Sequence, residues 1–310
     1  MLEGPVFAPH RNFGCRLREY VWRGQRCVLL ENRYVRAVIC PDKGCDILEL
    51  THKPTDTEVL YQTPRGLGSP QDAPSSPLPG GTFRDRFAGG WFVMMPNGPV
   101  PCEYGGASFG HHGEATNLGW DYTILDDRPE RVEVLFRTRL RRMPVALERR
   151  MVVEAGEGRL SLIETVCNES SQALGVFWGH HPCFGEPFVS SECEIELPSG
   201  ERLQLNDGDD DFTVLTGFDV GYFTIRNAAS GAGFSLRWEA SLFPTLGIWR
   251  QWGGAKDYPA YGRRILALEP AVDFPSLADA ATKGTALTLG AGQSRTTTLE
   301  ACVFDYPLKD

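Results

Sequence analysis

The sequence predicts an all-β protein, and three features of the chain indicate this. Apolar and polar residues alternate with a period of two along most of its length, and helical periodicity is almost absent. Gly 34 and Pro 22 together make 56 of 310 residues, about 18%, so residues that end short elements are frequent. Closely spaced strands separated by glycine-rich turns are typical of a β-sandwich or barrel.

The predicted strands are distributed along the whole chain. In the clearest one, 132–140, the side chains of Val132, Val134 and Phe136 share one face, and mostly charged residues occupy the other. Two further runs, 148–153 and 159–167, flank a glycine-containing turn at 154–158 and predict a β-hairpin. The other runs with this alternation are 192–197, 286–289 and 296–304.

One short helix and one long loop complete the predicted organisation. The helix spans 276–283, with Ser276 as its N-cap and Gly284 just beyond its end. The segment 64–84 holds five Pro, four Gly and three Ser in 21 residues, which favours a surface loop over a packed element. Because the strand pattern is the same on both sides, we expect a single domain over 1–310, with this loop at its surface.

Composition and charge narrow the class of function. With 42% hydrophobic and 23% charged residues the chain is typical of a folded globular protein. Its formal charge of -9 opposes binding to nucleic acid or to an anionic membrane, so a small-molecule ligand is expected. No membrane span, leader segment or CxxC motif is recognisable. We therefore expect a cytoplasmic monomer or homodimer that holds no metal.

Most of the histidines are concentrated in two places, which suggests that some of them are catalytic. Four of the six His form two adjacent pairs, His111-His112 and His180-His181. Pro182 confines His181 to an extended backbone, as suits a positioned acid or base. Neighbouring strand residues point to opposite faces, so only one histidine of each pair should enter a site. Taken singly, each could instead be a polar residue satisfied at a strand end.

A carboxylate stands in a comparable position later in the chain. Glu269 ends an apolar run and is followed by Pro270. Burial there would disfavour its ionised form and would raise its pKa, so that the side chain could act as a base near neutral pH. The alternative is an exposed carboxylate at the end of a strand.

Three short motifs follow one another in a particular order. They are His112-Gly113, His181-Pro182 and Leu268-Glu269-Pro270, the last followed by the predicted helix and a Leu-Gly-Ala-Gly-Gln turn. A strand pair around 30–50 precedes them. In this order the motifs resemble the aldose 1-epimerase (galactose mutarotase-like) family, over about residues 25–304.

The resemblance implies a galactose mutarotase-like β-supersandwich that interconverts the α and β anomers of a monosaccharide without a cofactor. In such an enzyme Glu269 would remove the proton of the anomeric hydroxyl, and His181 would donate a proton to the ring oxygen. His112 would form a hydrogen bond near the ring oxygen. Arg86, or as second choice Arg84, would contact the sugar hydroxyls.

Sugar binding suggests further candidates, because a pyranose presents apolar C–H faces that aromatic rings can cover. Trp249 and Trp252 flank two polar side chains, one of them Gln251, and Trp178 precedes the second histidine pair. We expect these four residues to bind substrate, although large aromatic residues in a sandwich more often belong to the core.

Two stretches depart from the better-known family pattern. Glu114-Ala115-Thr116 follows the first motif, where the typical galactose enzymes have more glycine. Cys183-Phe184-Gly185 follows the second, where they have an aromatic residue and then Phe-Asn. The sugar is therefore left open: it could be neutral, acidic or phosphorylated.

Three other functions remain open from the sequence. A metal-dependent cupin-like sugar isomerase would use the paired histidines and Glu114 as ligands, but adjacent pairs lack the His-x-His alternation that places two ligands on one strand face. A carbohydrate-binding or sensory module would keep the site without turnover. Polysaccharide lyase or glycosidase chemistry is the third, although the chain is short for it.

Overall fold

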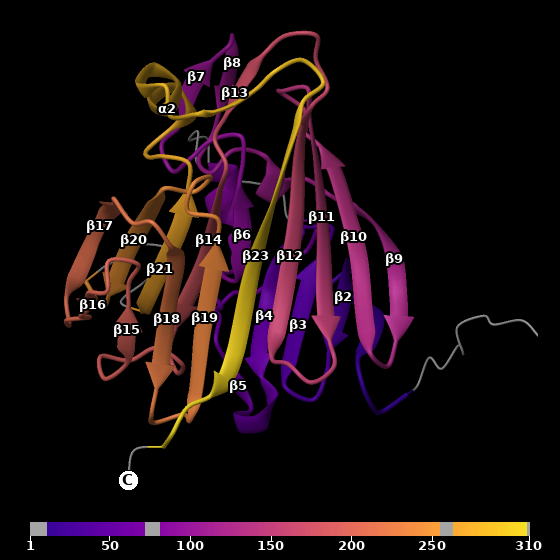
Figure 1. Cartoon of the computed structure of the whole chain (residues 1–310), viewed down its shortest axis with the longest axis vertical. Helices are drawn as coiled ribbons and strands as arrows, with labels where there is room; N and C mark the ends of the chain where they lie inside the picture. Colours follow the sequence, from indigo (N-terminus) through magenta and orange to yellow (C-terminus); the bar gives the residue numbers. More distant parts are fainter. Residues whose placement is uncertain (1–10, 72–80, 255–262, 309–310) are drawn as a thin grey trace, which may run out of the picture.

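Two large antiparallel sheets make up most of the molecule (Figure 1). The computed structural model describes residues 11–71, 81–254 and 263–308. The first sheet has ten strands, which in spatial order are β1 (Arg16–Trp22), β2 (Gln25–Glu31), β3 (Val35–Cys40), β4 (Asp46–His52), β6 (Trp91–Met94), β14 (Gly179–Gly185), β21 (Arg264–Ala271), β20 (Thr245–Trp252) and β17 (Asp209–Thr216), with β5 (Thr57–Glu58) paired to β4.

The second sheet has nine strands and is drawn in front in Figure 1. Its spatial order is β16 (Arg202–Leu203), β15 (Glu194–Glu196), β18 (Gly221–Asn227), β19 (Ala232–Trp238), β23 (Ser294–Asp305), β12 (Arg159–Asn168), β11 (Val145–Glu154), β10 (Arg131–Arg139) and β9 (Asp121–Arg128). Strands β2, β3 and β4 of the first sheet contact β11, β12 and β23 of the second, so the sheets form a sandwich.

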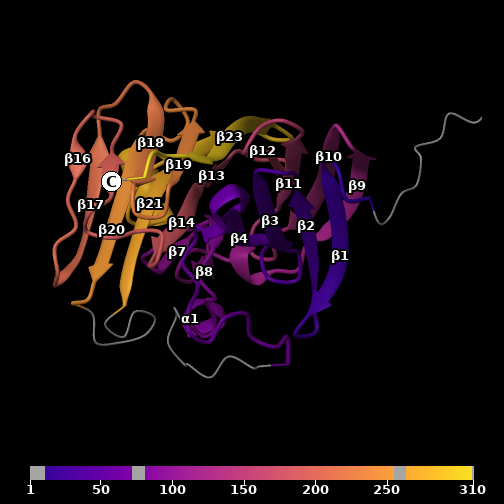
Figure 2. The same cartoon turned by 90° about the horizontal axis from the view of Figure 1, so that it is seen from below.

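The smaller elements lie around the sandwich. Two short sheets pair β13 (Leu174–Val176) with β22 (Leu287–Leu289) and β7 (Cys102–Tyr104) with β8 (Ala107–Phe109). The α-helices of the described part of the chain are α1 (Gly81–Arg86) and α2 (Leu277–Lys283), and its 3-10 turns are η1 (Lys53–Thr55) and η2 (Ala115–Asn117). Helix α1 lies below β8 in the view of Figure 2, and the ring of Phe83 on α1 is 5.1 Å from that of His111, in the turn that follows β8.

The predicted fold class, all-β with short helices, is confirmed. In β10 the alternating residues Val132, Val134 and Phe136 are fully buried, as their spacing predicts. The predicted hairpin is β11–β12. The side chain of Ser276 caps α2 by accepting from the backbone N–H of Asp279.

The predicted loop at 64–84 contains an element that the sequence pattern did not indicate. Its last residues belong to α1, which begins at Gly81. Residues 72–80 of this loop lie outside the described residues. One large cluster of buried apolar side chains includes residues of both sheets.

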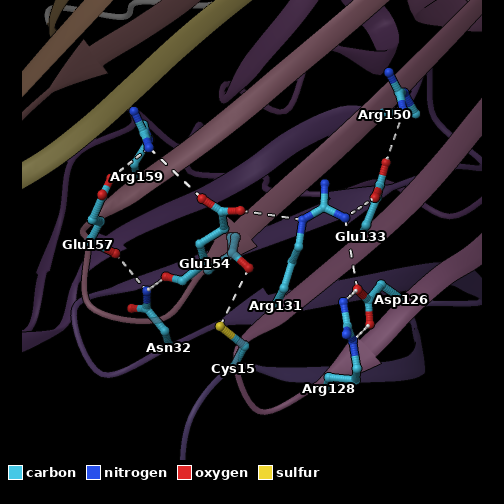
Figure 3. A network of polar contacts seen from close by, with 11 residues as sticks. Cys15, Asn32, Asp126, Arg128, Arg131, Glu133, Arg150, Glu154, Glu157 and Arg159 are labelled. Carbon is cyan, nitrogen blue, oxygen red and sulfur yellow. Dashed lines mark hydrogen bonds and ion pairs between the residues drawn. The ribbon is translucent and has the colours of Figure 1, made fainter. Parts of the chain in front are cut away.

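Polar contacts join the two sheets at one end of the sandwich (Figure 3). The side-chain amide of Asn32, which follows β2, donates to the backbone oxygens of Glu154 and Glu157 at 2.7 and 2.6 Å. Beside it, Arg131 and Arg159 form ion pairs with Glu154 at 3.4 and 4.0 Å. Exposed pairs of this kind contribute only about 0–1 kcal/mol each, so burial of the apolar cluster dominates the stability of the sandwich.

Candidate active site

His181 and Glu269 face each other across neighbouring strands in the middle of the first sheet. The antiparallel register of β14 and β21 pairs Cys183 with Ala267 and so places His181 opposite Glu269. Nε2 of His181 lies 3.1 Å from Oε1 of Glu269. A proline follows each of the two residues, and steric clash with its ring keeps the preceding backbone extended. Sheet register thus brings together two groups that are far apart in the sequence.

His112 reaches the same place from a turn. Its φ is 59°, in the left-handed region, and its backbone N–H donates to the oxygen of Gly98 at 2.8 Å. The next residue, Gly113, also has a positive φ, and a Cβ there would lie 2.3 Å from the oxygen of Met95. The imidazole of His112 meets that of His181 edge-on, with centroids 5.0 Å apart. Strained backbone of this kind costs about 1–3 kcal/mol and is common at functional sites.

The prediction that one histidine of each adjacent pair enters the site is right for one pair and wrong for the other. His180 points to the opposite face of its strand, where Nε2 lies 3.2 Å from Oε2 of Glu164 and Nδ1 accepts from the indole of Trp91 at 3.3 Å. His111 and His112 both line the site, with ring centroids 3.9 Å apart. The positive φ of His112 breaks the alternation that a strand would impose.

These side chains line a cavity of about 350 Å³ on the face of the first sheet that is turned away from the second sheet. This volume suits a small molecule. The sheet contributes Trp249 to the wall, and α1 contributes Phe83 and Arg84. The complete lining within the described residues is Phe83, Arg84, Phe87, Pro99, Val100, His111, His112, His181, Phe212, Trp249, Glu269 and Pro275.

Burial suppresses charge on the groups that line the floor of this cavity. Glu269 is 2% exposed, and desolvation raises the pKa of its carboxyl to about 8. Burial likewise lowers the pKa of His181 to about 3 and that of His111 to about 4. Burial, with the neighbouring histidines and Arg84, holds the pKa of His112 well below its usual range. At neutral pH Glu269 and His181 therefore share one titratable proton, beyond the N–H that a neutral imidazole always carries.

Two buried polar atoms in the site are left without a hydrogen bond from the described residues. They are Oε2 of Glu269 and Nδ1 of His112. Buried polar groups in folded proteins are nearly always paired, so an unpaired one marks a place where a ligand or water can bind. Both atoms belong to residues that line the cavity.

Of the predicted substrate-binding tryptophans, only Trp249 lies in the cavity. Trp178 is fully buried between the sheets, where its indole N–H donates to Glu164 at 3.3 Å. Trp252 is also fully buried, and it lies three residues from Trp249 along β20. Residues an odd number apart on a strand point to opposite faces, so Trp252 faces the core. The placement of Trp178 and Trp252 makes them core residues.

Two polar candidates also lie outside the cavity. The side-chain amide of Gln251 is bound to the carboxylate of Asp210 on the neighbouring strand. The guanidinium of Arg86 donates to the backbone oxygens of Asn117 and Asp42 at 3.0 and 3.5 Å. The arginine of the cavity is instead the second choice, Arg84.

The sequence pattern did not predict an aromatic wall formed by α1 and the residue that follows it. Phe83 and Phe87 line the cavity, and the ring of Phe83 lies 4.7 Å from that of His112. Their spacing of four residues places both on one side of a helical turn. That spacing was the available signal, but the surrounding proline and glycine concealed it.

Among the described residues, no cluster of three or more His, Cys, Asp or Glu side chains has the arrangement of a metal site. None of the helices in the same residues combines the length and the apolar character that crossing a membrane requires.

Comparison with solved structures places this fold among the galactose mutarotase-like proteins. A protein from Klebsiella pneumoniae subsp. pneumoniae MGH 78578, provisionally named an aldose 1-epimerase, is 14% identical and matches 94% of this chain and 88% of its own, with a TM-score of 0.75. A galactose mutarotase-like protein from Clostridium acetobutylicum is 15% identical over 94% of this chain and 99% of its own, with a TM-score of 0.64.

A galactose mutarotase related enzyme from Lactobacillus acidophilus is 17% identical over 94% of this chain and 100% of its own, with a TM-score of 0.65. At these identities the likeness establishes the fold alone. No curated protein sequence matches the chain significantly. A family described as "Domain of unknown function (DUF4432)" matches residues 22–214, which is more than half of the chain. The protein therefore belongs to the DUF4432 family and has a galactose mutarotase-like fold.

Proposed function

We propose that this protein is a cofactor-independent aldose 1-epimerase, which interconverts the α and β anomers of a monosaccharide. The observation that carries the proposal is the 3.1 Å contact between His181 and Glu269 in the wall of a cavity of small-molecule size. The fold shared with galactose mutarotase-like proteins supports the same reaction class.

The chemistry explains why these two groups are needed. Opening a cyclic hemiacetal requires that a proton leave the C1 hydroxyl while another reaches the ring oxygen. Rotation about the C1–C2 bond then presents the other face of the aldehyde, and the ring closes with the two proton transfers reversed. A base and an acid held near one anomeric centre are sufficient, and each positioned group contributes about 10²–10⁴ in rate.

Glu269 and His181 can supply both functions from one shared proton. Glu269 as carboxylate removes the proton of the anomeric hydroxyl, and His181 as imidazolium protonates the ring oxygen. Across 3.1 Å this arrangement differs from the neutral acid and imidazole by a single proton transfer. After ring opening the carboxyl is protonated and the imidazole is neutral, ready for the reverse transfers. The free Oε2 of Glu269 is the atom that would receive the anomeric proton.

The remaining lining residues would hold the sugar. The unpaired Nδ1 of His112 can form a hydrogen bond close to the ring oxygen. Arg84 is exposed and has no ion-pair partner within the described part of the chain, so its guanidinium can bind substrate oxygens. The indole of Trp249 can cover an apolar C–H face of a pyranose.

The direct test follows the optical rotation, or the anomeric NMR signals, of freshly dissolved pure anomers. The panel contains neutral aldoses, uronic acids and sugar phosphates, and Glu269→Gln serves as the matched inactive control. Acceleration of at least one sugar by the wild type and not by the variant supports the proposal. Binding of a sugar with no acceleration of any member of the panel would favour a binding module instead.

A further inference from the structure

The side chain of His111 lines the cavity that holds Glu269 and His181, and the proposed reaction gives it no role. The centroid of its ring lies 3.9 Å from that of His112 and 5.1 Å from that of Phe83. Nδ1 of His111 forms a hydrogen bond with the backbone oxygen of Pro99, which also lines the cavity. The protein therefore holds one edge of this imidazole in place.

The contact with Pro99 decides which nitrogen of His111 carries the ring proton. A carbonyl oxygen can only accept a hydrogen bond, so Nδ1 is the donor and carries hydrogen. Burial lowers the pKa of His111 to about 4, so the ring is neutral at neutral pH. Because a neutral imidazole has only one N–H, Nε2 of His111 presents a lone pair.

Nε2 of His111 is open to a ligand. Within the part of the chain that the structure describes, the hydrogen bond of this side chain is the one from Nδ1 to Pro99, so Nε2 has no partner there. The side chain is only partly buried, and Nε2 is not one of the buried polar atoms that lack a partner. The lone pair is therefore accessible from the cavity, whereas the unpaired Nδ1 of His112 is buried.

Acceptors for a sugar hydroxyl are scarce in this cavity. The proposed reaction uses Glu269 and His181 for proton transfer, and the guanidinium of Arg84 can only donate. Apart from the histidines, the other described lining residues are phenylalanine, tryptophan, proline and valine, whose side chains offer no acceptor. A sugar hydroxyl that is buried without an acceptor loses the hydrogen bond that it donates to water. An accessible nitrogen lone pair matches this need.

We infer that His111 is a substrate-binding residue, whose Nε2 accepts a hydrogen bond from a hydroxyl of the sugar other than the anomeric one. That the ligand is a sugar rests on the proposed function, whereas the accessible lone pair of His111 does not. The contact sets a requirement on the substrate, because the group that lies against His111 must donate. A carboxylate or a fully ionised phosphate at that position would direct its own lone pairs at the lone pair of Nε2.

Long-range 1H–15N NMR on the full chain labelled with 15N-histidine tests the contact without any turnover, and His111→Asn assigns the signals. We expect an Nδ1–H ring for His111 in the free protein at neutral pH. The protein is then titrated in turn with D-glucose, D-galactose, D-xylose, D-glucuronic acid and D-glucose 6-phosphate. At least one of them should move the Nε2 resonance of His111 upfield, as happens when a nitrogen lone pair accepts a hydrogen bond. An Nε2–H or doubly protonated ring, or an Nε2 resonance that none of these sugars moves, overturns the inference.

If the protein is active, variants of His111 separate a substrate contact from a structural one. His111→Asn keeps an N–H at the place of Nδ1, where it can donate to Pro99, but has no atom at the place of Nε2. We expect it to raise KM for the preferred sugar by about 2- to 10-fold, the range that one neutral hydrogen bond controls, with little change in kcat. His111→Gln, whose amide oxygen reaches the place of Nε2, should restore KM in part. The matched control is His52→Asn, which alters a buried histidine outside the cavity.

Monodeoxy derivatives of the preferred sugar identify the hydroxyl concerned. One derivative should raise KM of the wild type by the same factor as His111→Asn does, and should cause no further rise in that variant, because both changes remove the same hydrogen bond. Losses that multiply for every derivative, or an unchanged KM in an active His111→Asn, overturn the inference and leave the proposed function intact. A sugar that moves the Nε2 resonance of His111 in a protein that accelerates no anomer interconversion supports the contact and contradicts only the proposed function.

Discussion

The ring of Phe92 is stacked on the imidazole of His181, with centroids 4.5 Å apart and planes 20° apart. The two residues are paired in the register of β6 and β14, so the sheet itself sets this contact. Trp249 approaches the same imidazole at 5.9 Å from the strand two positions away in the first sheet. These rings restrict the orientation of His181, so that Nε2 remains directed at Glu269.

Removing this stacking should impair turnover more than binding. We expect Phe92→Leu to lower kcat for anomer interconversion by roughly 10-fold or more, because a small misplacement of a catalytic group can cost about 10²-fold. KM should change little, since Phe92 does not line the cavity. Phe188→Leu is the matched control, another fully buried phenylalanine outside the cavity lining. Equal kcat values for the two variants would show that stacking does not matter.

Activity should depend on pH through the pair rather than through a free histidine. Burial raises the pKa of Glu269 to about 8 and lowers that of His181 to about 3, so the pair holds one proton between these values. We therefore expect kcat/KM to be flat from about pH 5 to 7 and to fall above about pH 8, as the proton is lost. If kcat/KM instead changed steeply near pH 6.5, its pH dependence would be set by an exposed imidazole with an ordinary pKa.

The raised pKa of Glu269 also affects stability. The carboxyl titrates near 4.5 in its usual state and near 8 in the folded protein. Between these values the folded state binds more protons than the unfolded state, so this group makes stability fall as pH rises from 4.5 to 8. Glu269→Gln removes the effect and should raise Tm relative to the wild type more at pH 9 than at pH 5, by about 2 °C or more.

The matched control for this measurement is Glu148→Gln, because the side chain of Glu148 is 48% exposed. Its Tm difference from the wild type should be nearly the same at both pH values. Scanning calorimetry of the three proteins gives the comparison. A Tm difference for Glu269→Gln that does not grow with pH would mean that the buried carboxyl is not held in its neutral form.

Two nearby arginines should differ in their effect on substrate binding. Arg84 lines the cavity, whereas Arg86 donates to backbone oxygens outside it. We expect Arg84→Gln to raise KM for the preferred sugar by about 10-fold, the order of one charge-assisted hydrogen bond, while Arg86→Gln leaves KM within about twofold. Initial-rate measurements over a range of sugar concentrations decide this. If Arg86→Gln instead raised KM more than Arg84→Gln did, Arg86 would be the substrate-binding arginine.

Local patterns in the sequence were sufficient for much of the fold. Alternation identified β10, and the turn with Gly156, whose φ is 94°, marked the β11–β12 hairpin. The same alternation also predicts that Trp252, three residues from Trp249, faces the opposite way. The expectation that both tryptophans bind substrate did not take this into account.

Other features depend on geometry that no local pattern reports. The left-handed backbone of His112 is set by hydrogen bonds to the distant Gly98 and Met95, so the entry of His111 into the cavity was not predictable. Helix α1 lies in a segment rich in proline and glycine, and only its packing over the cavity reveals why Arg84 and not Arg86 reaches it.

The most direct test of Glu269 and His181 as one acid–base unit is a double-mutant cycle. The rate of anomer interconversion of the preferred sugar is measured for the wild type, Glu269→Gln, His181→Asn and the double variant, with circular dichroism to verify folding. The rate should fall roughly 10²-fold or more in each single variant. The rate of the double variant should be no lower than that of the less active single variant, because the groups act together. Full activity in either single variant, or losses that multiply in the double variant, would contradict the shared role of the two residues.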